Sequence, residues 1–126
     1  MKRLLITLTM LLIAVPAEAQ NWTKFIESDS AVHYIDLTTL RINGDMRKVW
    51  ELADLKTRHP DGEMSRRYLT EIDCKEERNR ILGNSEHPQP MAGGASLISN
   101  QKPSEWAYIA PGTLAAIVLR LVCAKR

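Results

Sequence analysis

The sequence predicts an α+β domain: an antiparallel β-sheet of about five or six strands, with a C-terminal α-helix packed on one face and a disulfide that joins the two. Three observations support this fold. Short segments rich in aromatic and β-branched residues, separated by turn residues, fill positions 21–110. Positions 111–126 change to a helical hydrophobic period. The two cysteines, Cys74 and Cys123, lie at the end of a strand-like segment and near the C-terminus.

Residues 1–19 have the features of a secretory signal peptide. A Lys-Arg start is followed by an apolar run from Leu4 to Val15 and then by Ala17-Glu18-Ala19. The apolar run is too short to cross a membrane, since a transmembrane helix needs about 20 apolar residues. We therefore expect cleavage after Ala19, which leaves one domain, residues 20–126, without a transmembrane helix.

The net charge argues against one class of partner, and the sequence at the end of the signal peptide indicates where in the cell the protein is found. The whole chain has 17 basic and 15 acidic residues. Loss of Lys2, Arg3 and Glu18 leaves 15 and 14, a balance that argues against nucleic acid as a partner because that partner needs a clustered basic face. The sequence near residue 19 has no cysteine to accept a lipid. A periplasmic or secreted protein is therefore favoured over one held at the cell surface.

The first two predicted strands, residues 21–28 and 31–42, flank a polar break. The Asn43-Gly44 pair that follows predicts a type I′ turn, which would pair residues 37–42 with 45–50 and set Ile42 opposite Asp45.

That register distributes apolar residues over both faces of the hairpin. One face carries Leu40, Ile42 and Val49, and the other carries Leu37, Trp50 and Leu52. One helix covers only one face of a sheet, so the second face needs a loop, a second subunit that would make a homodimer, or a ligand.

The middle of the chain continues as strands and loops. A turn at 59–62 leads to a strand at 63–74. Residues 75–82 suit a helix or an edge strand, with a strand paired back on 63–74 preferred. Residues 83–94 hold three Gly and two Pro and are expected to form a loop. Residues 95–99 and 105–110 are short strand candidates.

The C-terminal segment is predicted to form a helix that packs on the sheet. Thr113 is placed to cap its first turn, and Arg120 complements the negative end of the helix dipole. The apolar stripe follows the i, i+3, i+4, i+7, i+8 spacing and consists of Leu114, Ile117, Val118, Leu121 and Val122.

Cys74 and Cys123 are predicted to form a disulfide, because two cysteines in a small exported domain usually pair. The alternatives are a zinc site or a nucleophile. A zinc site needs about four closely spaced ligands, and the three histidines stand far apart in the sequence. A nucleophile needs a base and exposure, whereas Cys74 shares the inward parity of Tyr68 and Ile72.

The sequence contains no catalytic motif. Carboxylates are numerous enough to include a close pair, but nearby arginines are expected to pair with them, and no nucleophile elbow, phosphate loop or metal motif accompanies them. We therefore expect a protein that is not an enzyme and binds no metal or cofactor. The carboxylates considered are Asp36, Glu51, Asp54, Glu71 and Asp73.

The order of landmarks along the chain resembles the surface-adhesin protein E family, small exported proteobacterial domains with an antiparallel sheet and a helix. Each landmark is short, and their order and spacing carry the resemblance. They are Trp22, the YID of Tyr34 to Asp36, Asn43-Gly44, VWEL with Asp54, Ser65, the EIDC that ends at Cys74, Arg80, the glycines of MAGG, Trp106, PGT and Cys123.

The resemblance implies an adhesin that binds host extracellular-matrix or serum proteins. The alternative is a periplasmic interaction or structural domain without a host ligand. In either case we expect a non-catalytic module that binds a protein through its sheet or hairpin surface. Basic residues near the hairpin tip and on a neighbouring strand suggest a rim for acidic partners: Arg41, Arg47, Lys48, Arg66 and Arg67.

Overall fold

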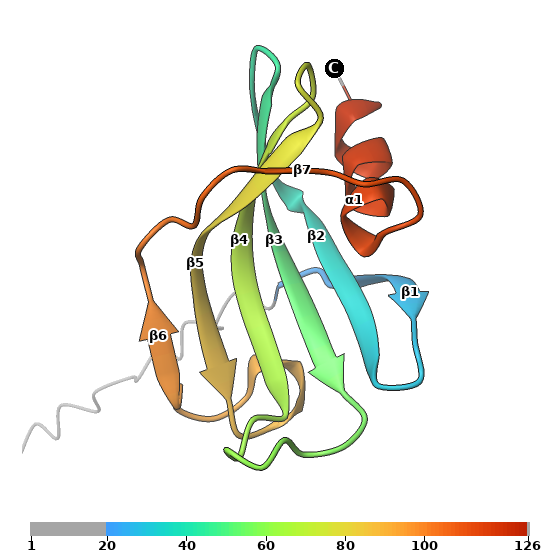
Figure 1. The fold of residues 1–126 in the computed structure, drawn as a ribbon. Helices are drawn as coiled ribbons and strands as arrows, with labels where there is room; N and C mark the ends of the chain where they lie inside the picture. Colours follow the sequence, from blue (N-terminus) through green and yellow to red (C-terminus); the bar gives the residue numbers. More distant parts are fainter. Residues whose placement is uncertain (1–19, 126) are drawn as a thin grey trace, which may run out of the picture.

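The computed structural model describes residues 20–125 and shows a curved antiparallel sheet with one α-helix against one of its faces (Figure 1). The predicted α+β class is confirmed, and the predicted signal peptide lies outside the described residues. Within them the sheet has seven strands, one or two more than the predicted number, because both short strand candidates, at 95–99 and 105–110, contribute a strand that pairs with residues 78–87. The elements are β1 Thr23–Glu27, β2 Ala31–Asn43, β3 Met46–Leu55, β4 Ser65–Asp73, β5 Arg78–His87, β6 Ile98–Asn100, β7 Ala107–Tyr108 and α1 Leu114–Cys123.

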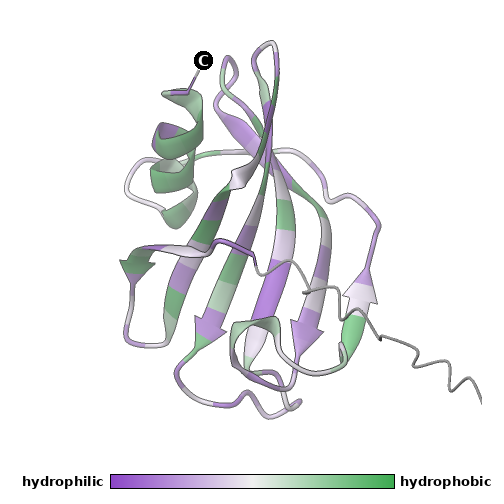
Figure 2. Cartoon of the chain, turned by 180° about the vertical axis from the view of Figure 1, so that it is seen from behind, coloured by the Kyte–Doolittle hydropathy of each residue, from purple (hydrophilic) through white to green (hydrophobic). Residues whose placement is uncertain are grey.

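The strands follow one another in space as they do along the chain. The order is β1-β2-β3-β4-β5-β6, and β7 pairs with the other end of β5. Short turns between antiparallel neighbours favour this meander. Hydrophobic and hydrophilic residues alternate in bands along the long strands (Figure 2), as expected for strands with one face on a core.

The hairpin between β2 and β3 forms with a different register from the predicted one. Asn43 pairs with Met46, so Gly44 and Asp45 make the two-residue loop and Ile42 faces Arg47. Only Gly44 has a positive φ there, 57°. Glycine at the first central position is typical of a type II′ turn, whereas the predicted type I′ turn requires positive φ at both central residues. The prediction placed the turn one residue too early.

One apolar residue of β2 also lies on the face opposite to the predicted one. The β2–β3 register shifts between Asp36 and Arg41, and Leu37 packs against the helix-side core together with Leu40. A bulge of this kind inserts extra residues on one strand and changes which side chains face inward. Trp50 and Leu52 lie on the other face, as predicted.

Residues 75–82 resolve into a turn followed by the start of β5. The Asp73 carboxylate accepts hydrogen bonds from the backbone N–H groups of Lys75 and Glu76, each at 3.1 Å, and Asp73 pairs with Arg78 across the turn. The preference for a strand is therefore confirmed from Arg78 onward.

The prediction of a loop over residues 83–94 is wrong for its first five positions, which belong to β5. Gly83 lies in the strand where the β4–β5 register shifts. A Cβ at this position would lie 3.1 Å from the carbonyl oxygen of Asn100. This glycine therefore permits close approach of a neighbouring chain segment and does not end the strand.

The helix-side core joins strand residues to the apolar stripe of α1. Ile35, Val49 and Ile72 are at most 1% exposed and pack against Val118 and Val122. The predicted cap is confirmed, since the Thr113 hydroxyl accepts a hydrogen bond from the backbone N–H of Ala116. The disulfide between Cys74 and Cys123 is also confirmed and holds the end of the helix to the sheet.

A loop and the N-terminal residues cover part of the opposite face, where Leu52 is fully buried. The Ser65 hydroxyl donates to the carbonyl of Gln89 at 2.6 Å and accepts from the N–H of Ala92 at 2.8 Å. The short 3-10 helix η1, Pro90–Ala92, thereby closes over β3 and β4. Of the three alternatives for this face, a loop covers the end nearest η1.

Candidate functional site

The five basic residues predicted to form one rim lie in different environments. Arg47 is only 6% exposed and lies on the helix side of β3. Its guanidinium donates to the carbonyls of Val122 at 3.2 Å and Lys125 at 3.0 Å, and to that of Gly44 at 2.7 Å. Arg47 therefore satisfies the C-terminal carbonyls of α1 and is not free to contact a partner.

Arg66 and Arg67 point to opposite faces of β4, as adjacent residues of a strand must. Arg66 forms a two-point ion pair with Glu63, at 2.9 and 3.0 Å, and a third contact with Glu86 at 3.0 Å. Arg67 lies on the other face with its guanidinium 5.4 Å from the centre of the Trp50 ring. These two residues do not share a surface.

Arg41 and Lys48 do share a surface, because they pair directly across the β2–β3 hairpin on the face opposite the helix. The same cross-strand row continues through Glu71 to Arg80. Lys48 and Arg80 both approach the Glu71 carboxylate, at 3.9 and 2.7 Å.

Two aromatic residues extend this row at the edge of the sheet. The guanidinium groups of Arg78 and Arg80 both lie over the Trp106 ring, 4.6 and 4.5 Å from its centre. Tyr108 pairs with Arg78 and is 79% exposed. We call this surface the aromatic–basic patch; it consists of Arg41, Lys48, Arg78, Arg80, Trp106 and Tyr108.

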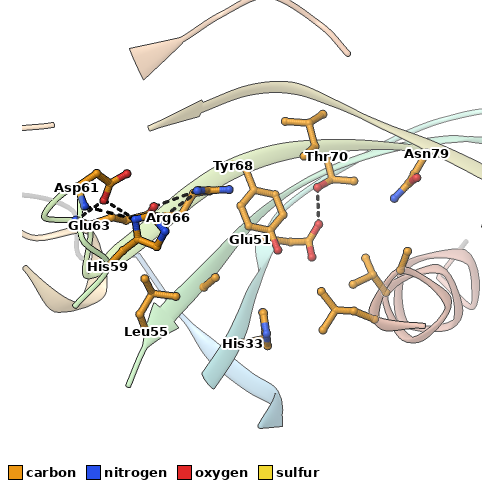
Figure 3. A pocket seen from close by; sticks show the side chains of 15 residues that line it. His33, Glu51, Leu55, His59, Asp61, Glu63, Arg66, Tyr68, Thr70 and Asn79 are labelled. Atoms are coloured by element: carbon orange, nitrogen blue, oxygen red, sulfur yellow. Dashed lines mark hydrogen bonds and ion pairs between the residues drawn. The ribbon is translucent and has the colours of Figure 1, made fainter. Parts of the chain in front are cut away.

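A pocket of about 510 Å³ lies beside the N-terminal half of the helix (Figure 3). It is on the face of the sheet that the helix covers, opposite the aromatic–basic patch. One wall is apolar and comes from α1 and the sheet: Ala53, Leu55, Ile81, Leu114, Ala115 and Val118. The polar residues lie on the strands and at the mouth, where His59, Asp61, Glu63 and Arg66 gather. We call this the helix-side pocket.

Glu51 is the most perturbed carboxyl group in the helix-side pocket. It is 3% exposed, the Thr70 hydroxyl donates a hydrogen bond to its carboxylate, and the Tyr68 side chain lies beside it (Figure 3). Burial raises the pKa of Glu51 from 4.5 to about 7, and the nearby hydroxyls of Thr70 and Tyr68 oppose this rise without cancelling it. Burial also raises the pKa of Tyr68, so its hydroxyl stays protonated.

The raised pKa of Glu51 predicts that this residue makes the protein less stable as pH rises from about 4.5 to about 7. In that interval the folded state holds a proton on Glu51 that the unfolded state has released, so the contribution present at low pH is lost. The expected loss is on the order of 2 to 3 kcal/mol. Chemical denaturation of wild type and Glu51→Gln at several pH values measures it, with exposed Glu76→Gln as the control. Parallel curves for wild type and Glu51→Gln would contradict the prediction.

The remaining carboxylates considered as catalytic candidates have separate structural roles. Asp36 accepts from the N–H groups of Asn21 and Thr38, and Asp54 accepts from that of Met91. Asp73 pairs with Arg78 at 3.1 Å. All of these, with Glu71, alternate onto the face opposite Glu51. No convergent acid, base and nucleophile emerges from residues 20–125.

One group of side chains has the composition of a metal site. His59, Asp61 and Glu63 each offer a ligand atom within 4.8 Å of the others. However, the Glu63 carboxylate is held by Arg66, and Asp61 is engaged with His59 at 2.9 Å and with the N–H of Glu63. These contacts explain the cluster without an ion.

Sequence reasoning missed the aromatic half of the patch and the importance of Glu51. The Trp106-x-Tyr108 spacing indicated two side chains on one face of a strand. Nothing local showed that this strand would pair with β5 beside Arg78 and Arg80. Glu51 was one of several acids, and its burial depends on Thr70 and Tyr68 of the neighbouring strand.

Within the described part of the chain, the helix is too short to span a membrane. Solved structures of Haemophilus influenzae protein E resemble this chain. The selenomethionine form has a TM-score of 0.63 and 12% identity, with 85% of this chain and 88% of that chain covered. Crystal form II has a TM-score of 0.60 and 13% identity, with 81% and 96% covered. At such identities the likeness shows the fold alone.

No curated protein matches the sequence. The family model for surface-adhesin protein E matches residues 22–124, which include every strand, the helix and both cysteines. This match agrees with the order of landmarks along the sequence and with the fold. The chain is a member of the surface-adhesin protein E family.

Proposed function

We propose that this protein is an exported, non-catalytic module that binds an acidic surface of a protein partner through the aromatic–basic patch. The observation that carries the proposal is the Trp106 ring, over which the guanidinium groups of Arg78 and Arg80 lie, in the same patch as the exposed Tyr108. Tryptophan, tyrosine and arginine are the residues enriched at the energetic centres of protein interfaces.

The patch is also suited to binding by its charge. It has four basic side chains, and the two acids among them, Glu71 and Asp73, are already paired with Arg80 and Arg78. The remaining positive charge favours a negatively charged partner and would speed association. The patch lies beyond the part of this face that the η1 loop covers.

Membership of an adhesin family supports a host extracellular-matrix or serum protein as the partner. A periplasmic partner is the alternative, motivated by the sequence around the predicted cleavage site. Cell fractionation separates the two. Protein accessible to protease on intact cells supports the adhesin, and protein confined to the osmotic-shock fluid supports the periplasmic role.

The double substitution Arg41→Glu and Lys48→Glu is expected to weaken binding to a matrix protein at least about ten-fold. Charge reversal turns attraction for an acidic partner into repulsion, while both side chains are exposed and their replacement leaves the core intact. Surface plasmon resonance against a panel of purified host matrix proteins measures the change.

Two further variants make this test specific. Tyr108→Ala should weaken binding without reversing charge, since Tyr108 is highly exposed and its loss removes only contact area. Arg120→Glu, an exposed charge reversal on α1, is the matched control and should leave binding unchanged. Equal affinities of the wild type and the double variant for the matrix protein would show that the patch does not contact the partner.

A further inference from the structure

The helix-side pocket contains a buried acid without a basic partner. The Glu51 carboxylate accepts a hydrogen bond from the Thr70 hydroxyl, and it forms no ion pair with any residue of the described part of the chain. A buried carboxylate is normally paired with a cation or neutralised. The described residues therefore leave Glu51 without a counter-charge.

The other charged or titratable groups of the pocket do not supply one. From β2, His33 faces the same side, and burial lowers its pKa, so its ring is neutral at neutral pH. From β4, Arg66 is committed to Glu63 and Glu86. Helix α1 contributes only Leu114, Ala115 and Val118.

The pocket also has the size and wall of a small-molecule site. Its volume of about 510 Å³ falls in the range of roughly 300 to 1,000 Å³ that is usual for such sites. An apolar wall with one or two convergent polar groups is the common design, because the wall provides affinity and the polar groups fix orientation.

We propose that the helix-side pocket binds a small aliphatic amine, with its ammonium group beside Glu51 and its hydrocarbon chain along Leu55, Leu114 and Val118. The ammonium group supplies the counter-charge that the protein itself lacks. The Thr70 hydroxyl holds the carboxylate in position, and a carboxylate that accepts one hydrogen bond still has lone pairs for further donors.

This binding is independent of the proposed protein-binding function, because the two sites lie on opposite faces. Along β5, Arg78 and Arg80 belong to the aromatic–basic patch, while Asn79 and Ile81 line the pocket. Loss of one activity therefore does not imply loss of the other.

The test compares three ligands of equal chain length, hexylamine, hexanol and hexanoate, by isothermal titration calorimetry at pH 8 with the mature protein. We expect hexylamine to bind at least about ten times more tightly than hexanol, since one charge-assisted hydrogen bond contributes about that much. Hexanoate should not bind. Equal affinity for hexylamine and hexanol, or preferential binding of hexanoate, would overturn the proposal.

Two variants test whether the preference for hexylamine over hexanol depends on the carboxyl group of Glu51. Glu51→Gln should abolish the preference for hexylamine over hexanol, and Asp61→Asn, which removes an exposed acid at the mouth, should keep it. Retention of the preference in a folded Glu51→Gln protein would overturn the assignment.

The wild-type protein provides a second measurement that does not depend on the folding of a variant. Between pH 6 and pH 8 the affinity for hexylamine should rise about ten-fold, as Glu51 ionises while the amine stays protonated. Titrations at pH 6 in two buffers of different ionisation enthalpy should show proton release. His59 also lines the pocket, so His59→Gln serves as the control and should keep the dependence on pH. An affinity independent of pH would overturn the proposal.

Discussion

Replacement of both cysteines, Cys74→Ser with Cys123→Ser, is expected to lower the free energy of unfolding by about 4 kcal/mol. The disulfide closes a loop between positions 49 residues apart, and the loop-closure model assigns roughly that loss of chain entropy to the unfolded state. For a domain of this size the loss is a large share of a total stability of about 5 to 15 kcal/mol.

The effect should be strongest at the helix, because Cys123 is the last residue of α1 and Cys74 follows β4. Urea denaturation with and without reductant measures the stability, and hydrogen exchange of the α1 amides shows where it is lost. Reductant should leave the double variant unchanged, which controls for other effects of the reagent. A wild-type midpoint insensitive to reduction, or two alkylatable cysteines in the purified protein, would contradict the prediction.

Arg47→Ala is expected to destabilise the protein by about 3 to 4 kcal/mol, far more than an ordinary basic residue of the hairpin. The substitution removes charge-assisted hydrogen bonds to the carbonyls of Val122, Gly44 and Lys125. One bond of this kind contributes about 1.5 to 3 kcal/mol, and the contributions of several bonds made by one side chain add to less than their sum. It also leaves carbonyls at the end of α1 without a partner.

Two other variants separate this role from charge alone. Arg47→Lys keeps the charge but cannot reproduce the planar fork that reaches several carbonyls, so most of the loss should remain. Arg41→Ala, at an exposed position of the same hairpin, should change the stability by less than about 0.5 kcal/mol. Thermal and urea unfolding measure all three variants. A loss for Arg47→Ala no greater than that for Arg41→Ala would show that the contacts at the helix end contribute little.

The sequence by itself determined the parts of this protein that depend on neighbouring residues. The strands at 21–28 and 31–42 follow from local runs of β-branched and aromatic residues. Thr113 and the apolar spacing that begins at Leu114 define the helix, since both signals lie within a few turns. The disulfide followed from the number of cysteines and the predicted compartment, and it required no knowledge of the fold.

Only the tertiary structure decided which side chains meet. The bulge in β2 turned Leu37 toward the core, and the shifted hairpin register set Ile42 opposite Arg47. Gly83 was predicted to lie in a loop, but it lies within β5, where the backbone of Asn100 in β6 comes too close for a side chain. This neighbour is distant in the sequence, so the role of the glycine could not be predicted. Each of these outcomes depends on a partner strand, so no local pattern reveals it.

The residues of the candidate sites could not be identified from the sequence for the same reason, because their environments depend on distant parts of the chain. Arg47 looked like a surface charge until the end of α1, 75 residues later in the chain, was placed over it. Glu51 became a buried acid with a raised pKa only when the sheet and the other pocket residues removed it from water, which no local pattern around position 51 indicates. A side chain's composition and spacing are local, whereas its burial, its partners and its ionisation depend on residues that the fold brings from elsewhere in the chain.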